Sequence, residues 1–144
     1  MKLINRVGAV FLLREDGVAL LQLRDEKPGL RHAGKWVPPG GHAEHGEKIE
    51  DCANREFYEE TNYKCHALNY LIEFEDEVPG WSKYTLTVYW ELYDSMQDIR
   101  CNEGQDLRFI GRHEMDGYDV PGYLLDIWDQ AIKQANIKGL TCND

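Results

Sequence analysis

The chain has 144 residues, of which 42% are hydrophobic and 29% charged, the composition of a soluble globular protein. This length predicts a single domain over residues 1–144, large enough to bury its own core. A net charge of −10 repels nucleic-acid backbones and anionic membrane surfaces, so we expect neither as a partner. A phosphorylated ligand would need other cations to neutralise it, and metal ions held by acidic side chains are the obvious candidates.

The cysteines lie far apart in the sequence, with no Cys-x-x-Cys pair and no histidines at zinc spacing: Cys52, Cys65, Cys101 and Cys142. We interpret them as reduced thiols and expect a cytoplasmic protein. The apolar run at 7–13 ends in Arg14-Glu15-Asp16 rather than in a small-residue cleavage site, which argues against a signal peptide. No stretch approaches the ~20 apolar residues of a membrane span.

Two apolar runs, 7–13 and 18–23, are separated by a turn containing Asp16-Gly17, and we predict them as adjoining strands. Because neither run alternates with polar residues, both faces of these strands should be covered by helices. Residues 25–35 indicate a loop, and the Pro/Gly cluster at 36–41 predicts another turn.

Further elements follow this turn. Residues 47 to about 61 contain strong helix formers without internal Gly or Pro, and Asn62 can take the left-handed conformation that ends a helix. We predict strands over 68–74 and 107–110, and a third over 83–93, where polar and apolar residues alternate. Apolar residues at three- and four-residue steps from Pro121 to Ala135 predict a final amphipathic helix.

The first helix has carboxylates where its apolar stripe should be. At about 100° per residue from Ile49, Glu56 and Glu60 lie at about −20° and about 20°, among the apolar side chains. A solvated charged face accounts for Glu50 and Asp51 but not for this pair. Buried like charges one turn apart are costly unless cations or protons intervene, and one Arg55 cannot neutralise three glutamates. Divalent metal binding explains the pattern better than a structural acid cluster.

The order Gly41, Glu47, Arg55-Glu56, Phe57, Glu59-Glu60 and Tyr63 resembles the Nudix box, Gly-x5-Glu-x7-Arg-Glu-U-x-Glu-Glu-x-Gly-U, in which U is bulky and apolar. Every charged position matches. The one departure is Asn62 in place of Gly, and Asn is the next best residue at a left-handed helix end.

The resemblance implies an α/β fold, a Nudix-type α/β/α sandwich around a mixed β-sheet, with bound Mg²⁺ or Mn²⁺. It implies Glu56, Glu59 and Glu60 as metal ligands and the Gly40 carbonyl as a further one, with Glu47 supporting the cluster. It also implies that Arg55 orients Glu59.

Outside the box, Glu103 resembles an additional metal-binding or basic glutamate of related enzymes, although an exposed turn acid is the alternative; Asp106 is a weaker substitute. Either Glu56 or Glu103 could accept the proton of the attacking water. Base-stacking candidates are Trp36, Trp81, Tyr84 and Tyr118, and phosphate-binding candidates are Arg24, Arg31 and Lys35. For each of them, a place in the core or on the surface is the favoured interpretation.

The resemblance implies a metal-dependent hydrolase of a small-molecule nucleoside diphosphate derivative. A nucleoside or deoxynucleoside triphosphate cleaved to monophosphate and pyrophosphate is the first choice, and nucleotide sugars or other such compounds are the alternative. A non-catalytic nucleotide-binding regulator or a protein-interaction domain would explain the complete set of acids less well. The sequence leaves the oligomeric state open and allows a homodimer.

Overall fold

The computed structural model describes residues 5–28, 30, 32–76 and 83–136. Within these ranges the elements are, in chain order, β1 (Asn5–Leu13), β2 (Ala19–Leu23), β3 (Trp36–Val37), β4 (Gly40–His42), α1 (Ile49–Thr61), β5 (Asn69–Asp76), β6 (Tyr84–Leu92), β7 (Asp106–Ile110) and α2 (Gly122–Gln134). None of these helices is long and apolar enough to cross a membrane.

Strand β1 is the centre of the sheet. It pairs in parallel with β6 along its whole length and antiparallel with β2 and β4. The main strand order is β3-β2-β1-β6-β5, and β7 pairs with β2. One parallel pairing among antiparallel ones makes the sheet mixed, as expected.

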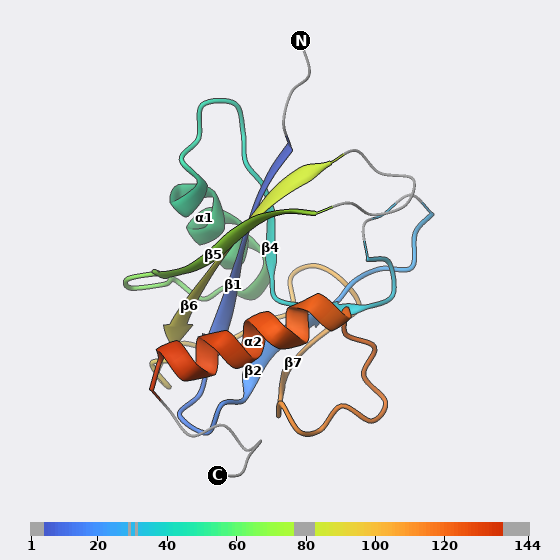
Figure 1. Ribbon diagram of the computed structural model, residues 1–144, viewed down its shortest axis with the longest axis vertical. Coiled ribbons are helices and arrows are strands. Elements are labelled where there is room, and N and C mark those ends of the chain that lie inside the picture. The colour runs from blue at the N-terminus through green and yellow to red at the C-terminus, as the bar shows by residue number, and fades with distance from the viewer. Residues whose placement is uncertain (1–4, 29, 31, 77–82, 137–144) are drawn as a thin grey trace.

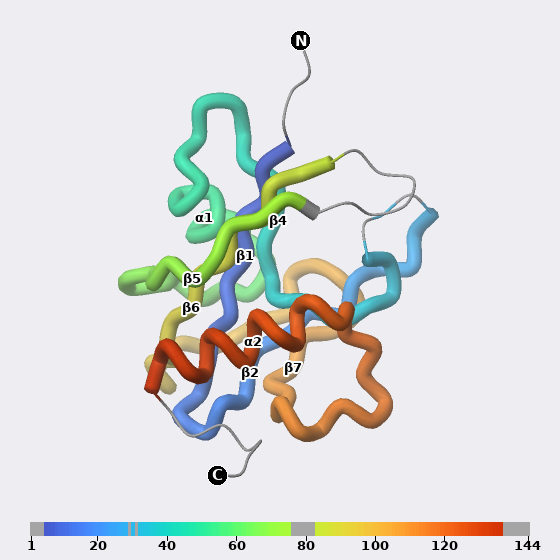
Figure 2. The backbone as a smooth tube through the Cα atoms, in the orientation of Figure 1, coloured from blue at the N-terminus to red at the C-terminus, as the bar shows by residue number. Residues whose placement is uncertain are grey.

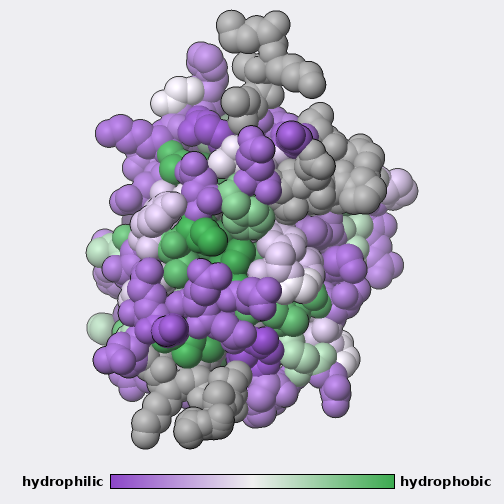
Figure 3. All heavy atoms as spheres, in the orientation of Figure 1, coloured by the Kyte–Doolittle hydropathy of each residue, from purple (hydrophilic) through white to green (hydrophobic). Residues whose placement is uncertain are grey.

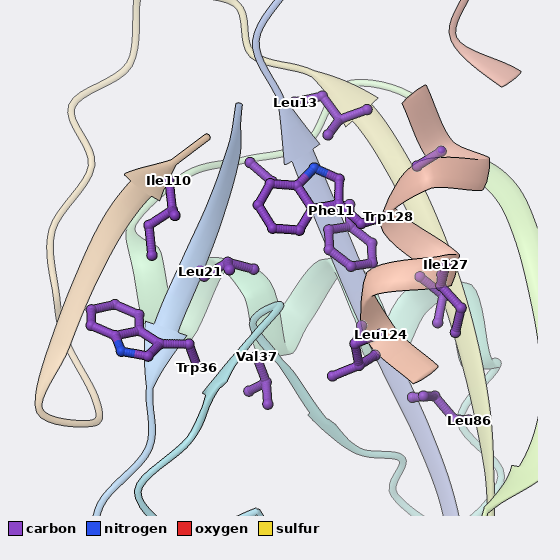
Figure 4. Close-up of a cluster of buried hydrophobic side chains, with 14 of the residues drawn as sticks. Phe11, Leu13, Leu21, Trp36, Val37, Leu86, Ile110, Leu124, Ile127 and Trp128 are labelled. Carbon is purple, nitrogen blue, oxygen red and sulfur yellow. The ribbon is translucent and has the colours of Figure 1, made fainter. Parts of the chain in front are cut away.

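The two helices cover opposite faces of this sheet (Figure 1). Alternate residues of β1 point in opposite directions: Phe11 and Leu13 pack with Trp128 and Ile127 of α2, whereas Leu12 packs in the cluster that contains α1. Figure 4 shows the first cluster, in which the aromatic rings of Phe11 and Trp128 lie 6.1 Å apart. The continuous apolar runs therefore reflect burial on both faces, and the predicted α/β/α sandwich is confirmed.

The smooth chain trace in Figure 2 shows that the segment 36–42 runs between the β2 end of the sheet and β1. The sequence predicted only a turn here. Pro38-Pro39 does make a turn, but it joins two short strands: Trp36–Val37 pairs with β2, and Gly40–His42 with β1. Strand pairing of so few residues leaves no periodic signal, which is why the pattern missed it.

Helix α1 begins at Ile49, two residues later than expected. Glu47 stays in the preceding turn, where its Oε1 accepts a hydrogen bond from the Glu44 N–H at 2.9 Å. At the other end Asn62 has φ 67° and its N–H donates to Tyr58 O at 2.8 Å. The left-handed helix end predicted for Asn62 is confirmed.

The surface seen in Figure 3 is largely hydrophilic, with apolar side chains showing in its centre, next to α2. Cys52, Cys65 and Cys101 are free thiols, as expected, and Cys142 lies outside the described residues.

Candidate active site

Helix α1 separates its acids into two groups. Glu50 and Asp51 are exposed, as the helical wheel predicted. Glu60 is only 3% exposed and Glu56 is half-buried, so both lie on the packed side of the helix. Glu59 lies beside them with a side chain 53% exposed.

Arg55 holds three of the carboxylates at the rim of this group. Its Nε and Nη2 donate to the two oxygens of Glu47 at 2.8 and 3.0 Å, a bidentate pair. Its Nη1 donates to Glu56 Oε2 at 3.1 Å and to Glu59 Oε2 at 3.2 Å. The hydrogen bonds from Arg55 and from the Glu44 N–H lower the pKa of Glu47 to about 2. Glu47 thus anchors the guanidinium, which in turn orients both helix acids.

Glu60 lies deeper than the guanidinium. Its Oε1 accepts hydrogen bonds from Gln22 Nε2 at 3.1 Å and from the Gly40 N–H at 3.2 Å. Burial, followed by the charges of Glu103 and Glu56, raises the pKa of Glu60 to about 9. Burial likewise raises the pKa of Glu56, and the neighbouring Glu59 and Glu103 act in the same direction. The four acids therefore lie close enough to influence one another.

Two glycines of β4 allow close approaches, Gly41 to the Glu56 carboxylate and Gly40 to the backbone of β1. A Cβ atom on Gly41 would lie 2.1 Å from Glu56 Oε1, and one on Gly40 would lie 2.1 Å from Gly8 O. Any larger residue at either position would displace the strand or the carboxylate. This close approach gives the Gly pair a physical role, which the sequence pattern alone did not show.

Glu103 comes to the site from the loop before β7. The Asn102 N–H donates to Glu60 O at 3.0 Å, and Gln22 Nε2 donates to Glu103 O at 3.2 Å. Asp106, the weaker candidate, is instead bonded by Arg108 Nε at 2.7 Å. Of the two outside acids, Glu103 is the one whose charge acts on Glu60 and Glu56.

Glu103 also lies in the wall of a cavity of about 270 Å³, whose lining residues are Gln22, Arg24, Asp25, Lys27, Leu30, Glu103 and Gly104. Its volume suits a phosphate or sugar group rather than a whole nucleotide. Arg24, one of the candidate phosphate contacts, lies in its wall.

The other candidate ligand contacts are buried, paired with another side chain or outside the described residues. Trp36 and Tyr84 are buried in the core, and Lys35 Nζ pairs with Asp119 Oδ2 at 2.9 Å. Tyr118 packs edge-on against Trp36 at a ring distance of 5.4 Å. Trp81 and Arg31 lie outside the described residues.

The chemistry of this donor set fits a hard divalent cation. Glu56, Glu59, Glu60 and Glu103 offer only oxygen, the ligand type that Mg²⁺ and Mn²⁺ prefer. No three acidic, His or Cys side chains of the described part of the chain converge on one point as a finished metal site. Arg55 and Gln22 hold the oxygens instead, and a cation would compete with these donors.

Gln22 is the site residue that sequence reasoning missed. It is a polar residue, 3% exposed, in the otherwise apolar strand β2. That contrast was a usable signal, because a buried amide in such a strand needs hydrogen-bond partners.

Comparison with known proteins points the same way. The family model described as NUDIX domain matches residues 2–123. A Rhodopseudomonas palustris RNA pyrophosphohydrolase is 35% identical over 129 residues, covering 85% of this chain and 67% of the relative. A Caenorhabditis elegans protein whose name assigns it to the nudix hydrolases is 36% identical over 83 residues, or 56% of this chain.

The NUDIX domain of Shewanella oneidensis NrtR, solved with ADP ribose, has a TM-score of 0.77 at 17% identity. That match covers 94% of this chain and 90% of the NrtR chain, and it bears on the fold alone. The chain spans only 22% of the C. elegans relative, whose activity as a whole protein is therefore not carried over.

Proposed function

Since the chain belongs to the Nudix hydrolase family, we propose that it is a metal-dependent pyrophosphohydrolase acting on a nucleoside diphosphate derivative. The observation that carries the proposal is the electrostatically coupled group of Glu56, Glu59, Glu60 and Glu103. Glu103 also lines a cavity whose wall includes Arg24 and Lys27. Buried carboxylates are costly to the fold, and a cation that bridges them to an anionic substrate would offset that cost.

Mg²⁺ or Mn²⁺, when bound by Glu56, Glu59 and Glu60, with Glu103 and the Gly40 carbonyl as further oxygen donors, would neutralise the diphosphate and acidify a water. Arg55 keeps Glu56 and Glu59 turned toward this group through hydrogen bonds of 3.1 and 3.2 Å. Gly40 and Gln22 hold Glu60 from the opposite side.

A carboxylate must accept the proton of the attacking water. Burial and the neighbouring acids raise the pKa of Glu56, which makes it a better proton acceptor than an ordinary surface acid. Glu103 is the other candidate and lies on the exposed loop facing the cavity. We propose Glu56 as the first choice, because Arg55 restricts its orientation.

A nucleoside or deoxynucleoside triphosphate is the proposed substrate, in an intracellular and cytoplasmic setting that suits the free thiols. The similarity to an RNA pyrophosphohydrolase adds a second candidate, a 5′-triphosphorylated oligonucleotide. The net charge of −10 disfavours a long RNA chain, so we expect the small molecule to be the better substrate.

The test is to incubate the protein with Mg²⁺ or Mn²⁺ and nucleoside triphosphates, nucleotide sugars, dinucleoside polyphosphates, ADP-ribose and a 5′-triphosphorylated oligonucleotide, measuring released phosphate products. Glu60→Gln should lower kcat/KM at least 100-fold, because it removes a ligand charge. Glu50→Gln is the matched control: the same change on the exposed side of α1 should leave the rate within twofold.

Turnover that resists Glu60→Gln would exclude the proposed site. Metal-dependent nucleotide binding without turnover by the unmodified protein would instead favour the regulatory alternative.

A further inference from the structure

Gln22 connects two parts of the site that are distant in sequence. From the middle of β2 its Nε2 donates to Glu60 Oε1 at 3.1 Å and to Glu103 O at 3.2 Å. Those partners lie 38 and 81 residues away, one on α1 and the other on the loop before β7. One amide hydrogen of Gln22 is thus used on α1 and the other on the loop before β7.

The Glu103 loop packs tightly on this side chain. Gly104 has φ +82°, and a Cβ there would lie 2.7 Å from Leu23 O and 3.1 Å from Gln22 Cγ. The Gln105 N–H donates to Leu23 O at 2.8 Å, so backbone pairing holds the loop on the β2 side. The loop is therefore fixed against β2 by backbone pairing, and the Gln22 side chain packs against Gly104 and bonds Glu103 O.

The Glu103 loop brings a second acid against Glu60. The two side chains are close enough to share a hydrogen bond, and the negative charge of Glu103 disfavours ionisation of Glu60. A neutral amide is suited to hold them, because it donates to both sides without adding a charge of its own. An apolar side chain of the same length would fill the space but leave both oxygens without this donor.

We propose that Gln22 is a positioning residue that holds the Glu103 loop against Glu60, so that acids from α1 and from the loop serve one divalent cation. This inference rests on the proposed function for the identity of the site, and it adds a residue outside the Nudix box. Without the amide, the loop keeps its backbone bonds to Leu23 and Glu60, but Glu103 loses the bond that fixes its backbone against β2 and its carboxylate is positioned less well for the cation.

The test measures Mn²⁺ affinity of the full chain by the electron paramagnetic resonance signal of free Mn²⁺. Gln22→Met should raise the Mn²⁺ Kd by about 10- to 100-fold, the usual cost of removing a partner that orients a metal ligand. The Mn²⁺ concentration for half-maximal hydrolysis should rise likewise, with kcat at saturating Mn²⁺ changed less than about threefold.

Gln105→Met is the matched control. Gln105 Nε2 bonds Arg24 O at 2.8 Å in the same loop, without touching Glu60, so its loss should change the Mn²⁺ Kd less than about threefold. In a Glu103→Gln background, Gln22→Met should raise the Mn²⁺ Kd less than it does in the otherwise unchanged protein, because the loop acid is already gone and only the bond from Gln22 to Glu60 Oε1 remains to be lost. Gln22→Asn keeps an amide but is one methylene too short to reach both oxygens, and it replaces Gln22→Met if that variant does not fold.

Each of the following outcomes supports or overturns the role proposed for Gln22. Equal effects of Gln22→Met and Gln105→Met, or an undiminished effect of Gln22→Met in the Glu103→Gln background, would overturn the inference while the proposed function stands. Weakened Mn²⁺ binding by Gln22→Met without hydrolysis in any protein would support the inference and refute the proposed activity. A wild-type chain that does not bind Mn²⁺ would overturn both.

Discussion

At the scale of single residues, the buried carboxyl group of Glu60 lowers the stability of the metal-free protein but supplies an oxygen ligand to the proposed metal site. Its carboxyl group is buried beside two other acids, and its pKa is about 9 in the folded chain against 4.5 for an ordinary glutamate. Such a raised pKa means that the folded state binds a proton that the unfolded state releases. The contribution of Glu60 to the free energy of unfolding is therefore fully present below about pH 4.5 and is lost as the pH rises through about 9.

Glu60→Gln should accordingly stabilise the metal-free protein. The neutral amide still offers an oxygen to Gln22 and Gly40, and it removes the charge that burial disfavours. At pH 8 in EDTA we expect a gain of about 1–3 kcal/mol, with Tm rising roughly 3 °C for each kcal/mol. Thermal unfolding followed by circular dichroism from pH 5 to pH 9 measures this gain.

The advantage of Glu60→Gln should shrink toward pH 5, which approaches the unfolded-state pKa of 4.5, because the proton taken up by the folded wild type then costs little free energy. Glu50→Gln, on the exposed side of α1, serves as the control and should change Tm little at any pH. A Glu60→Gln protein that melts below the wild type at pH 8 would contradict the burial argument.

At the scale of elements, the end of α1 depends on one backbone conformation. Asn62 stands where the Nudix box has Gly, and its φ of 67° is the left-handed region that glycine adopts without steric cost. Its side-chain Nδ2 also donates to Asp98 O, at a long 3.4 Å. The cap therefore depends on the backbone more than on the side chain.

Asn62→Gly should keep both fold and activity, with a stability change within about 0.5 kcal/mol. Asn62→Val should destabilise the protein by about 1–2 kcal/mol, because a β-branched side chain is strained at positive φ. Urea unfolding of the two variants compares these costs. An Asn62→Val protein as stable as Asn62→Gly would show that the backbone conformation matters less than proposed.

At the scale of the whole molecule, β1 joins two cores. Leu12 and Leu13 are adjacent in sequence and both fully buried, yet they belong to different clusters on the two faces of the sheet. Because one strand serves both clusters, neither layer can loosen without disturbing the other. We therefore expect the described part of the chain to unfold as one cooperative unit.

Leu12→Ala and Leu13→Ala should each cost about 2–5 kcal/mol by opening a cavity, on the α1 side and the α2 side respectively. Both should lower the Tm of one and the same calorimetric transition. Met96→Ala is the control, since that side chain is 85% exposed and should have little effect. Two separate transitions in either leucine variant would count against a single cooperative unit.

The sequence alone was sufficient to predict the features that depend on residues close together along the chain. The spacing of Arg55, Glu56, Glu59 and Glu60 on one helix, the left-handed Asn62 and the apolar runs of β1 and β2 follow from local geometry, and each prediction agrees with the structure. Two helix residues one turn apart share a face whatever the rest of the chain does.

Contacts between distant segments required the fold. Trp36 and Tyr84 could be ligand contacts by residue type, and only the packing of the sheet against α2 makes them core. Glu103 lies beside Glu60 because the loop before β7 crosses β2, and Gln22 joins them across 38 and 81 residues. Periodicity specifies the face of a strand but not which segments meet there, because strand order and loop path are set by packing over the whole chain.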